Sequence, residues 1–200
     1  MIIHRMEQYS PEWWLVRQGI PTASCADKIL TPTGKLSTQS RGYINELIAD
    51  SLGFGDPPME PTEHMLIGIE REPQARAYHD LVYGTEIEQV GFITNNEGTF
   101  GCSPDGIIDE DTGWECKSPK ASTHIGYLLS GKLPAYYRPQ VHMSMVVSGM
   151  KKWTFMSYFP GLDPLVIPVE WDEYTEAIAA AIDGFVVQLR DARKRLGLAA

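Results

Sequence analysis

The chain has 200 residues, 43% of them hydrophobic, with 17 Lys and Arg against 26 Asp and Glu for a formal charge of −9. This length suits one globular domain over residues 1–200, and no apolar run reaches the roughly 20 residues of a membrane-spanning helix. The charge argues against a protein that coats DNA, although a basic groove can coexist with an acidic surface. The N-terminus lacks the pattern of a signal peptide, and the three cysteines form no CxxC pair, so we expect a soluble cytoplasmic protein with reduced thiols.

The first part of the sequence is predicted to be mainly helical. Ser10 followed by Pro11 is a typical helix start, PTAS is predicted to cap a second helix, and Thr62 a later one that bends at Pro73. A loop dense in Gly and Pro is expected at 53–62. From capping residues and apolar spacing, the helices are predicted at 11–18, directly after PTAS, at 37–53 and at 63–83.

The middle of the sequence has the pattern of an antiparallel hairpin series. Short apolar runs alternate with turn sequences; the runs are VGFIT (90–94), TFGCS (99–103), GIIDE (106–110) and WECKS (114–118). Two further helices, two strands and a closing helix capped by Asp172 follow, at 123–130, 135–148, 153–159, 164–171 and 173–195. The predicted fold class is therefore α/β in its mixed α+β form, with a central mixed sheet flanked by helices.

The stretch CSPDGIIDEDTGWECKSP contains the candidate active site. Asp105 stands at a turn, and Glu115 and Lys117 follow two residues apart, which places both on one face of a strand. A hairpin that turns at 111–113 would bring Asp105 beside them. Taken singly, a PDG turn and a Glu-x-Lys pair are more often structural than functional, but the three residues together predict a site.

Two carboxylates and one ammonium in this arrangement fit the hydrolysis of phosphodiesters. The reaction needs a hard cation with oxygen ligands, so Asp105 and Glu115 are predicted to bind Mg²⁺, with Mn²⁺ as a substitute. Lys117 is predicted to orient or deprotonate the attacking water and to neutralise charge on the phosphate. The side chain of Cys116 is expected on the opposite face of the strand, with its backbone carbonyl as a further metal ligand.

The pattern PD-x9-E-x-K resembles the signature of the PD-(D/E)xK nucleases, and the neighbouring segments resemble the lambda exonuclease and YqaJ-type viral recombinase family. The matching segments are WLVRQGIPTAS (14–24), GIEREPQAR (68–76), CSPDG (102–106), ECKSP (115–119) and YRPQVHMSM (137–145). Together they are more specific than the nuclease signature alone. The resemblance implies a restriction-endonuclease-like core and a phage or prophage origin, in a bacterial host cell.

The resemblance also implies roles for further residues. Glu72 matches an acidic residue that approaches the metal, which makes it a candidate catalytic residue and metal ligand, and Gln140 matches a glutamine that faces the same cleft. Arg17 matches an arginine that holds the 5′ phosphate of a DNA end, and Ser24 and Ser103 match hydroxyls near that phosphate. Structural interpretations stay open: Glu72 as an exposed acid paired with the arginine four residues later, Arg17 as a helix-surface residue, and Ser24 as a cap.

The function that the resemblance implies is a Mg²⁺-dependent exonuclease acting 5′→3′ on one strand of double-stranded DNA. It would leave 3′ single-stranded overhangs for recombination, act as a ring of three identical subunits around DNA ends, and operate beside a single-strand annealing protein. Two alternatives remain: a PD-(D/E)xK endonuclease with the same metal site, and a DNA-end-binding recombination scaffold without catalysis. A covalently closed circular plasmid distinguishes the endonuclease from the exonuclease, because only an endonuclease would cut it.

Overall fold

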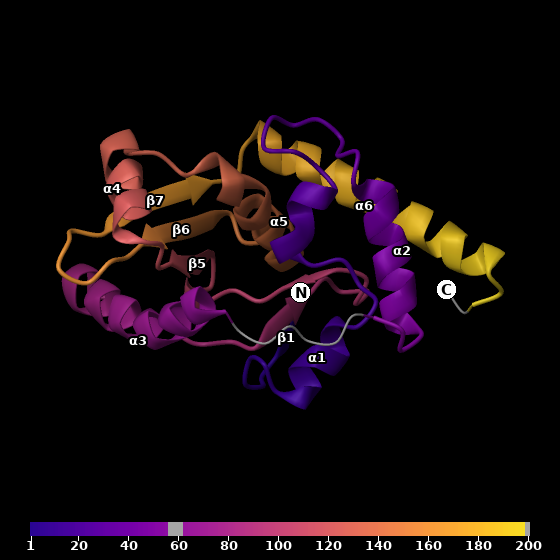
Figure 1. The fold of residues 1–200 in the computed structure, drawn as a ribbon, viewed down its shortest axis with the longest axis horizontal. Coiled ribbons are helices and arrows are strands. Elements are labelled where there is room, and N and C mark those ends of the chain that lie inside the picture. The colour runs from indigo at the N-terminus through magenta and orange to yellow at the C-terminus, as the bar shows by residue number, and fades with distance from the viewer. Residues whose placement is uncertain (56–61, 199–200) are drawn as a thin grey trace.

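Seven strands in two sheets lie at the centre of the structure, a computed structural model that describes residues 1–55 and 62–198 (Figure 1). The first sheet is antiparallel, with the order β1 (Ile2–His4), β2 (Phe92–Thr94), β3 (Gly101–Cys102). The second has the order β4 (Gly106–Asp109), β5 (Thr112–Lys117), β6 (Lys152–Ser157), β7 (Leu165–Glu170). In the second sheet β5 and β6 are parallel and the other two pairs are antiparallel.

Helices surround the two sheets. The α-helices are α1 (Pro11–Arg17), α2 (Ser40–Ser51), α3 (Glu63–Tyr83), α4 (Ala121–Ser130), α5 (Arg138–Ser148) and α6 (Glu173–Arg195). Two short 3₁₀ segments, η1 (Ala23–Lys28) and η2 (Ala135–Tyr137), complete the described elements. The predicted class, a mixed α and β fold with helices around the sheet, is confirmed. No described helix combines the length and apolar character needed to cross a membrane.

The predicted caps of three helices are confirmed. The side chains of Ser10, Thr62 and Asp172 accept hydrogen bonds from backbone N–H groups at the starts of α1, α3 and α6. These bonds satisfy donors that have no partner within the helix. The helix α3 continues through Pro73 without interruption. Of the loop predicted at 53–62, residues 56–61 lie outside the described residues.

Three expectations about local structure are wrong. PTAS leads into the 3₁₀ segment η1, and Thr22 caps it without a side-chain hydrogen bond. The β4–β5 turn lies at 110–111, because Asp109 pairs with Thr112, and Gly113 is inside β5. Gly113 is required there by packing: a Cβ at this position would overlap the ring of Trp153. The expected single sheet is divided in two, and β1, which the sequence analysis missed, extends the smaller sheet.

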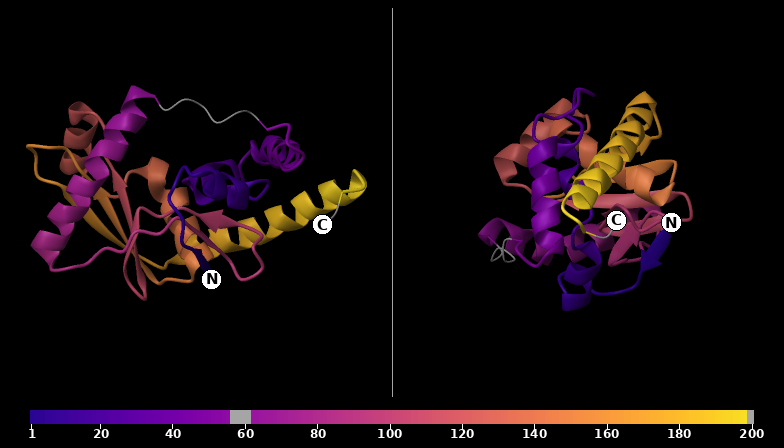
Figure 2. Two further views of the ribbon diagram at one scale, coloured as in Figure 1. Left: turned by 90° about the horizontal axis from the view of Figure 1, so that it is seen from below. Right: turned by 90° about the vertical axis from the view of Figure 1, so that its right-hand side faces the viewer.

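The four-stranded sheet is covered on both faces. On one face Trp114, Cys116 and Met156 pack with Ala75 of α3, whereas Phe155 of β6 belongs to the main core shared with α5 and α6. Figure 2 shows α3 beside this sheet at one end of the molecule and α6 extending toward the other end. The arrangement leaves the end of β5 that bears Lys117 between α3 and α5.

Candidate active site

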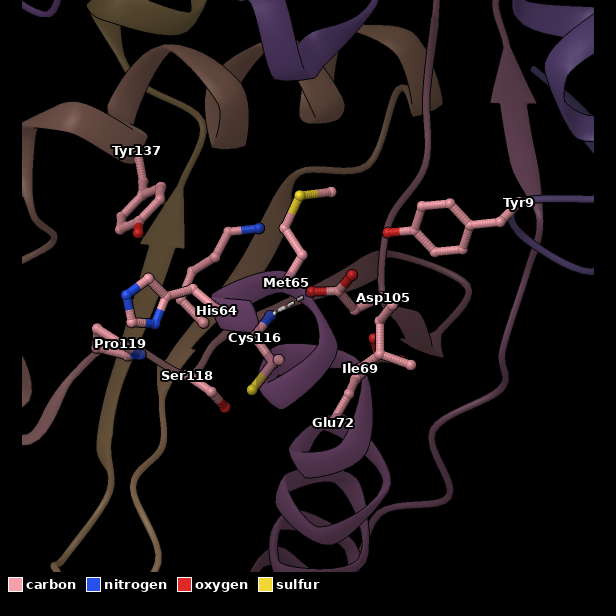
Figure 3. A pocket seen from close by; sticks show the side chains of 12 residues that line it. Tyr9, His64, Met65, Ile69, Glu72, Asp105, Cys116, Ser118, Pro119 and Tyr137 are labelled. Atoms are coloured by element: carbon pink, nitrogen blue, oxygen red, sulfur yellow. Dashed lines mark hydrogen bonds between the residues drawn. The ribbon is translucent and has the colours of Figure 1, made fainter. Parts of the chain in front are cut away.

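Asp105 lies directly before β4 and is tied to the neighbouring strand. Its Oδ2 accepts a hydrogen bond of 2.7 Å from the backbone N–H of Cys116 in β5, shown as a dashed line in Figure 3. The hairpin therefore brings Asp105 beside the segment that contains Glu115 and Lys117, as the spacing predicted. The position of its carboxylate is set by the backbone of β5, so it is fixed by the fold itself.

Glu115 and Lys117 point to the same face of β5 and contact each other. The Nζ of Lys117 forms an ion pair with Oε1 of Glu115, and Nε2 of Gln140 in α5 donates to the same oxygen at 2.6 Å. Glu115 is only 1% exposed, and its other oxygen, Oε2, has no hydrogen-bond partner within residues 1–55 and 62–198. A buried, unpartnered carboxylate oxygen is costly unless a cation or donor reaches it.

Cys116 alternates with these two residues and faces the other way. Its thiol is buried among Trp114, Met156 and Ala75, which confirms the predicted direction of the side chain. Burial raises the pKa of the Cys116 thiol well above its ordinary value, with Asp105 adding to the increase. A neutral thiol is a poor nucleophile, so only the backbone of Cys116 is suited to a role in the site.

Glu72 reaches the site from α3. It forms an ion pair with Arg76 one turn later on the helix, and Nε2 of Gln89 lies 3.4 Å from its Oε1. The guanidinium of Arg76 also lies 3.4 Å from the backbone carbonyl of Asp105. The predicted pairing with Arg76 is confirmed, but Glu72 is partly buried and not exposed, and it lines the same cavity as Asp105, so its role as a metal ligand stays a prediction. Arg76 was not predicted as a site residue, although its spacing from Glu72 is a visible signal.

The site borders a cavity of about 350 Å³ (Figure 3). Glu72, Asp105 and Lys117 line it, whereas the buried Glu115 does not contribute to its wall. Aromatic and apolar side chains complete the lining, including those of Tyr9, Met65, Ile69 and Tyr137. An open cavity that combines charged side chains with aromatic and apolar ones is suited to a nucleotide.

Burial is the main cause of the pKa shifts at the site, and interactions among the charged residues modify it. Burial raises the pKa of Glu115 to about 7, with Asp105 adding to the increase and Lys117 opposing it. Burial and then Asp105 raise the pKa of Glu72 to about 7, and burial raises the pKa of Asp105. Burial alone would lower the pKa of Lys117, but Glu115 and Asp105 outweigh it and the pKa rises. Lys117 is therefore an ammonium at neutral pH, which favours charge neutralisation over deprotonation of water.

Arg17 and Ser103 form a second group next to Asp105. The Nη1 of Arg17 donates to Oγ of Ser103 at 2.8 Å, and Nε1 of Trp13 donates to the same hydroxyl at 3.0 Å. The guanidinium lies 4.0 Å from the centre of the Trp13 ring. Burial lowers the pKa of Arg17, which still remains charged near neutral pH. Trp13 was not predicted as a site residue, and only its aromatic character signals this contact.

Ser24 is the predicted residue that the structure leaves apart. It is exposed in η1, and its hydroxyl lies 3.1 Å from that of Thr22. In the described parts of the chain no hydrogen bond joins Ser24 to Arg17 or Ser103. The structure therefore brings Arg17 and Ser103 together. Ser24 lies inside η1, whose N-cap is Thr22, so the capping interpretation of Ser24 is wrong, and its contact with the phosphate stays a prediction.

The described residues also include no ready-made metal cluster of three or more His, Cys, Asp or Glu side chains. The three carboxylates of the site are instead held by protein partners: Glu72 by Arg76, Glu115 by Lys117, and Asp105 by a backbone N–H. The donor set nevertheless fits a divalent cation. Carboxylate oxygens are the ligands of Mg²⁺, and the buried Oε2 of Glu115, which has no partner in the described parts of the chain, is free to accept such a contact.

Comparisons with known structures find the same fold. An alkaline exonuclease, LHK-Exo from Laribacter hongkongensis, is 29% identical with a TM-score of 0.81, over 94% of this chain and 96% of that one. The structure of LHK-Exo in complex with dAMP is matched at 26% identity and a TM-score of 0.76, over 94% and 98% of the two chains. A phage-related exonuclease from Haemophilus somnus 129PT shares the fold at 14% identity and a TM-score of 0.65, over 86% and 96%.

The sequence itself identifies the family. No curated protein sequence matches the chain. The model of the YqaJ-like viral recombinase domain matches residues 12–151, a range that contains Arg17, Glu72, Asp105, Lys117 and Gln140. The predicted relationship is confirmed on both sequence and structure, and the chain belongs to the YqaJ-like viral recombinase family.

Proposed function

We propose that the protein is a Mg²⁺-dependent exonuclease that degrades one strand of double-stranded DNA in the 5′→3′ direction. The observation that carries this proposal is the juxtaposition of two groups: Asp105, Glu115 and Lys117 at the cavity, and the Arg17–Ser103 pair beside it. The first group suits hydrolysis of a phosphodiester, and the second suits a terminal phosphate. The similar LHK-Exo is an alkaline exonuclease, and one of its structures contains dAMP, a mononucleotide.

In this proposal Asp105, Glu115, Glu72 and the backbone carbonyl of Cys116 hold the cation. When bound, Mg²⁺ or Mn²⁺ supplies Lewis-acid stabilisation of the charge on the scissile phosphate and favours ionisation of water. Calcium, with its larger and looser ligand shell, is expected to support binding without cleavage. The predicted roles of these residues rest on their oxygen donors and on the unpartnered Oε2 of Glu115.

Two side-chain cations of this chain, Lys117 and Arg17, are proposed to act on the substrate. The Lys117 ammonium lies against Glu115 and neutralises charge that develops on the phosphate during cleavage. Gln140 holds the carboxylate of Glu115 in place through its hydrogen bond of 2.6 Å. The planar guanidinium of Arg17, with the Ser103 hydroxyl, holds the 5′ phosphate and so selects one strand from its end. Ser24, which forms no hydrogen bond with either residue in the described parts of the chain, is proposed to contact the same phosphate.

The biological setting in this proposal is phage recombination. The enzyme acts on double-stranded DNA ends in the cytoplasm of a bacterial host, as a homotrimeric ring formed from single-domain subunits spanning residues 1–200. It leaves 3′ single-stranded overhangs, which a single-strand annealing protein then pairs. Membership of the viral recombinase family supports this setting.

A linear duplex with a different label at each end of one strand tests the proposal. With Mg²⁺ present, we expect the 5′ label to appear first, as a mononucleotide, and a covalently closed plasmid to remain intact. Excess chelator should stop the reaction, and Ca²⁺ should not restore it. Release of the 3′ label first would refute the polarity, fragments from the closed plasmid would indicate an endonuclease, and cleavage in chelator would refute the metal requirement.

A further inference from the structure

Tyr9 has a backbone conformation that its side chain does not favour. Its φ is +67°, and within residues 1–55 and 62–198 it is the only non-glycine residue with a positive φ. L-residues adopt this left-handed conformation at an energetic cost, because the Cβ comes close to the backbone. Such strained residues are concentrated at functional sites, where the surrounding structure holds them in place.

The segments on both sides of Tyr9 hold it in this conformation. Before it, Nε2 of Gln8 donates to the carbonyls of Pro104 at 3.0 Å and Val90 at 3.2 Å. After it, Ser10 caps α1 by accepting a hydrogen bond from the N–H of Trp13 at 3.2 Å. The backbone of Tyr9 is therefore attached both to the residue before Asp105 and to the helix that carries Arg17.

The strained backbone directs the side chain into the cavity. The Tyr9 ring packs against Trp13, with 5.1 Å between the ring centroids, but the residue is still 51% exposed. Figure 3 shows its hydroxyl oxygen pointing toward Asp105 from the side of the cavity opposite Tyr137. Within the described residues, this hydroxyl has no hydrogen-bond partner.

Tyr9 lines the cavity with Glu72, Asp105 and Lys117, and its ring packs on Trp13, whose indole N–H shares the Ser103 hydroxyl with Arg17. Burial raises the pKa of Tyr9, Asp105 and Glu72 raise it further, and Lys117 and Arg17 lower it. Tyr9 therefore adjoins the cleavage site directly and the proposed phosphate-binding arginine through Trp13. A phenol of this kind is a hydrogen-bond donor at neutral pH, and the oxygens of a nucleotide are acceptors.

We infer that Tyr9 positions the DNA strand between the phosphate held by Arg17 and the phosphodiester cleaved beside Asp105. Its hydroxyl donates a hydrogen bond to the terminal nucleotide, and its ring forms the wall against which that nucleotide rests. This inference rests on the proposed function and adds to it a contact that fixes the distance from the strand end to the cleaved bond. Because the contact is to substrate, its loss should slow cleavage without weakening the fold.

Two substitutions separate this role from a structural one. Tyr9→Phe removes only the hydroxyl, and we expect the single-turnover rate on 5′-phosphorylated duplex to fall by about tenfold, with Tm unchanged within about 1 °C. Tyr9→Gly also removes the ring, and we expect a larger loss of rate. Its Tm should stay within about 3 °C of wild type, because glycine relieves the left-handed strain as the ring contact is lost. Tyr83→Phe, at an exposed tyrosine of α3, is the matched control and should cleave like wild type.

The inference is wrong if Tyr9→Phe retains both the rate and the DNA affinity of wild type within twofold. It is also wrong if Tyr9→Gly loses Tm and rate together while Tyr9→Phe loses neither. Failure of the proposed function is distinguishable, because wild type itself would then not degrade the linear duplex. In that case fluorescence anisotropy with labelled 5′-phosphorylated duplex and Ca²⁺ tests the Tyr9 contact by itself. Weaker binding by Tyr9→Phe than by wild type supports the contact, and equal binding refutes it.

Discussion

The two oxygens of the Glu115 carboxylate have different surroundings, and this difference suggests how the cavity works. Oε1 contacts both Lys117 and Gln140, whereas the buried Oε2 has no partner in the described parts of the chain. A stable fold alone would favour an apolar residue or a fully paired one at this position. The carboxylate is therefore expected to matter more for cleavage than for folding.

We accordingly predict that Glu115→Gln and Lys117→Ala each lower the single-turnover cleavage rate by at least about 10², because each removes a charge from the cavity. DNA binding and the circular dichroism spectrum should remain close to those of wild type. Glu110→Gln, an exposed acid in the turn of the same hairpin, is the control and should change the rate by less than twofold. A variant of Glu115 or Lys117 that cleaves within a few-fold of wild type would exclude that residue from the site.

Arg17 is predicted to read the 5′ phosphate of the strand end. Wild type should digest 5′-phosphorylated duplex faster than 5′-hydroxyl duplex, and Arg17→Ala should remove most of this preference by slowing the phosphorylated substrate. Arg17→Lys should restore part of it, because an ammonium lacks the planar pair of donors. Arg41→Ala, an exposed arginine of α2, serves as control. If Arg17→Ala keeps the full preference, the phosphate is held elsewhere.

His142 is a buried histidine whose titration should affect stability. Burial lowers its pKa to about 4, against the opposing effect of Asp172, whereas an unfolded histidine titrates near 6.5. Between pH 6.5 and 4 the unfolded chain therefore binds a proton that the folded chain does not. The contribution of His142 to the free energy of unfolding is fully present above pH 6.5 and decreases as the pH falls through this range. At pH 5 the free energy of unfolding should be lower by about 2 kcal/mol from this residue.

Urea denaturation at pH 7 and pH 5 measures this effect. We expect the stability of His142→Gln relative to wild type to rise by about 2 kcal/mol between pH 7 and pH 5. The other groups titrate in both proteins and cancel in this comparison: burial lowers the pKa of His79, which decreases stability as pH falls, and raises the pKa of Glu72 and of Glu115, which increases it. His64→Gln, at an exposed position, should behave like wild type. An unchanged pH dependence in His142→Gln would show that its titration is not coupled to unfolding.

At the scale of secondary structure elements, close packing of β5 against β6 positions the strand that bears Glu115 and Lys117. The six residues of β5 pair in parallel with β6, and Gly113 leaves space for the Trp153 ring. We predict that Gly113→Ala lowers the free energy of unfolding by about 1–3 kcal/mol, because the added methyl group overlaps that ring. Gly184→Ala in α6, where a Cβ meets nothing, should raise it by about 0.5–1 kcal/mol. Equal effects of the two changes in thermal denaturation would contradict this packing role.

At the scale of the whole molecule, exposed apolar side chains suggest surfaces for subunit contacts. Leu81 and Leu129, on α3 and α4, are each 85% exposed, and Val82 is 52% exposed. We predict a trimer of 22.4 kDa subunits at micromolar concentration, since a closed ring would retain the DNA between cuts. Light scattering coupled to size-exclusion chromatography measures the mass directly. A monomer at every concentration would contradict the prediction, and the nuclease assay would still test cleavage independently.

The sequence alone was sufficient for features that depend on neighbouring residues. Caps such as Ser10 and Asp172 act within one helical turn, so their positions are visible in the sequence. The alternation of a strand likewise placed Glu115 and Lys117 on one face and Cys116 on the other. Family resemblance added Glu72, Gln140, Arg17 and Ser103, whose contacts the structure now describes.

Tertiary structure decided everything that depends on residues far apart in the chain. The pairing of β1 with β2 joins segments about ninety positions apart, and it adds a strand to the smaller of the two sheets. The turn of the β4–β5 hairpin was misplaced because Gly113 is selected by its contact with Trp153, which no local rule contains. The direction of Tyr9 likewise depends on Gln8 bonding to Val90 and Pro104. Such contacts are determined by the packing of the whole core, whereas local sequence limits only the conformations from which packing selects.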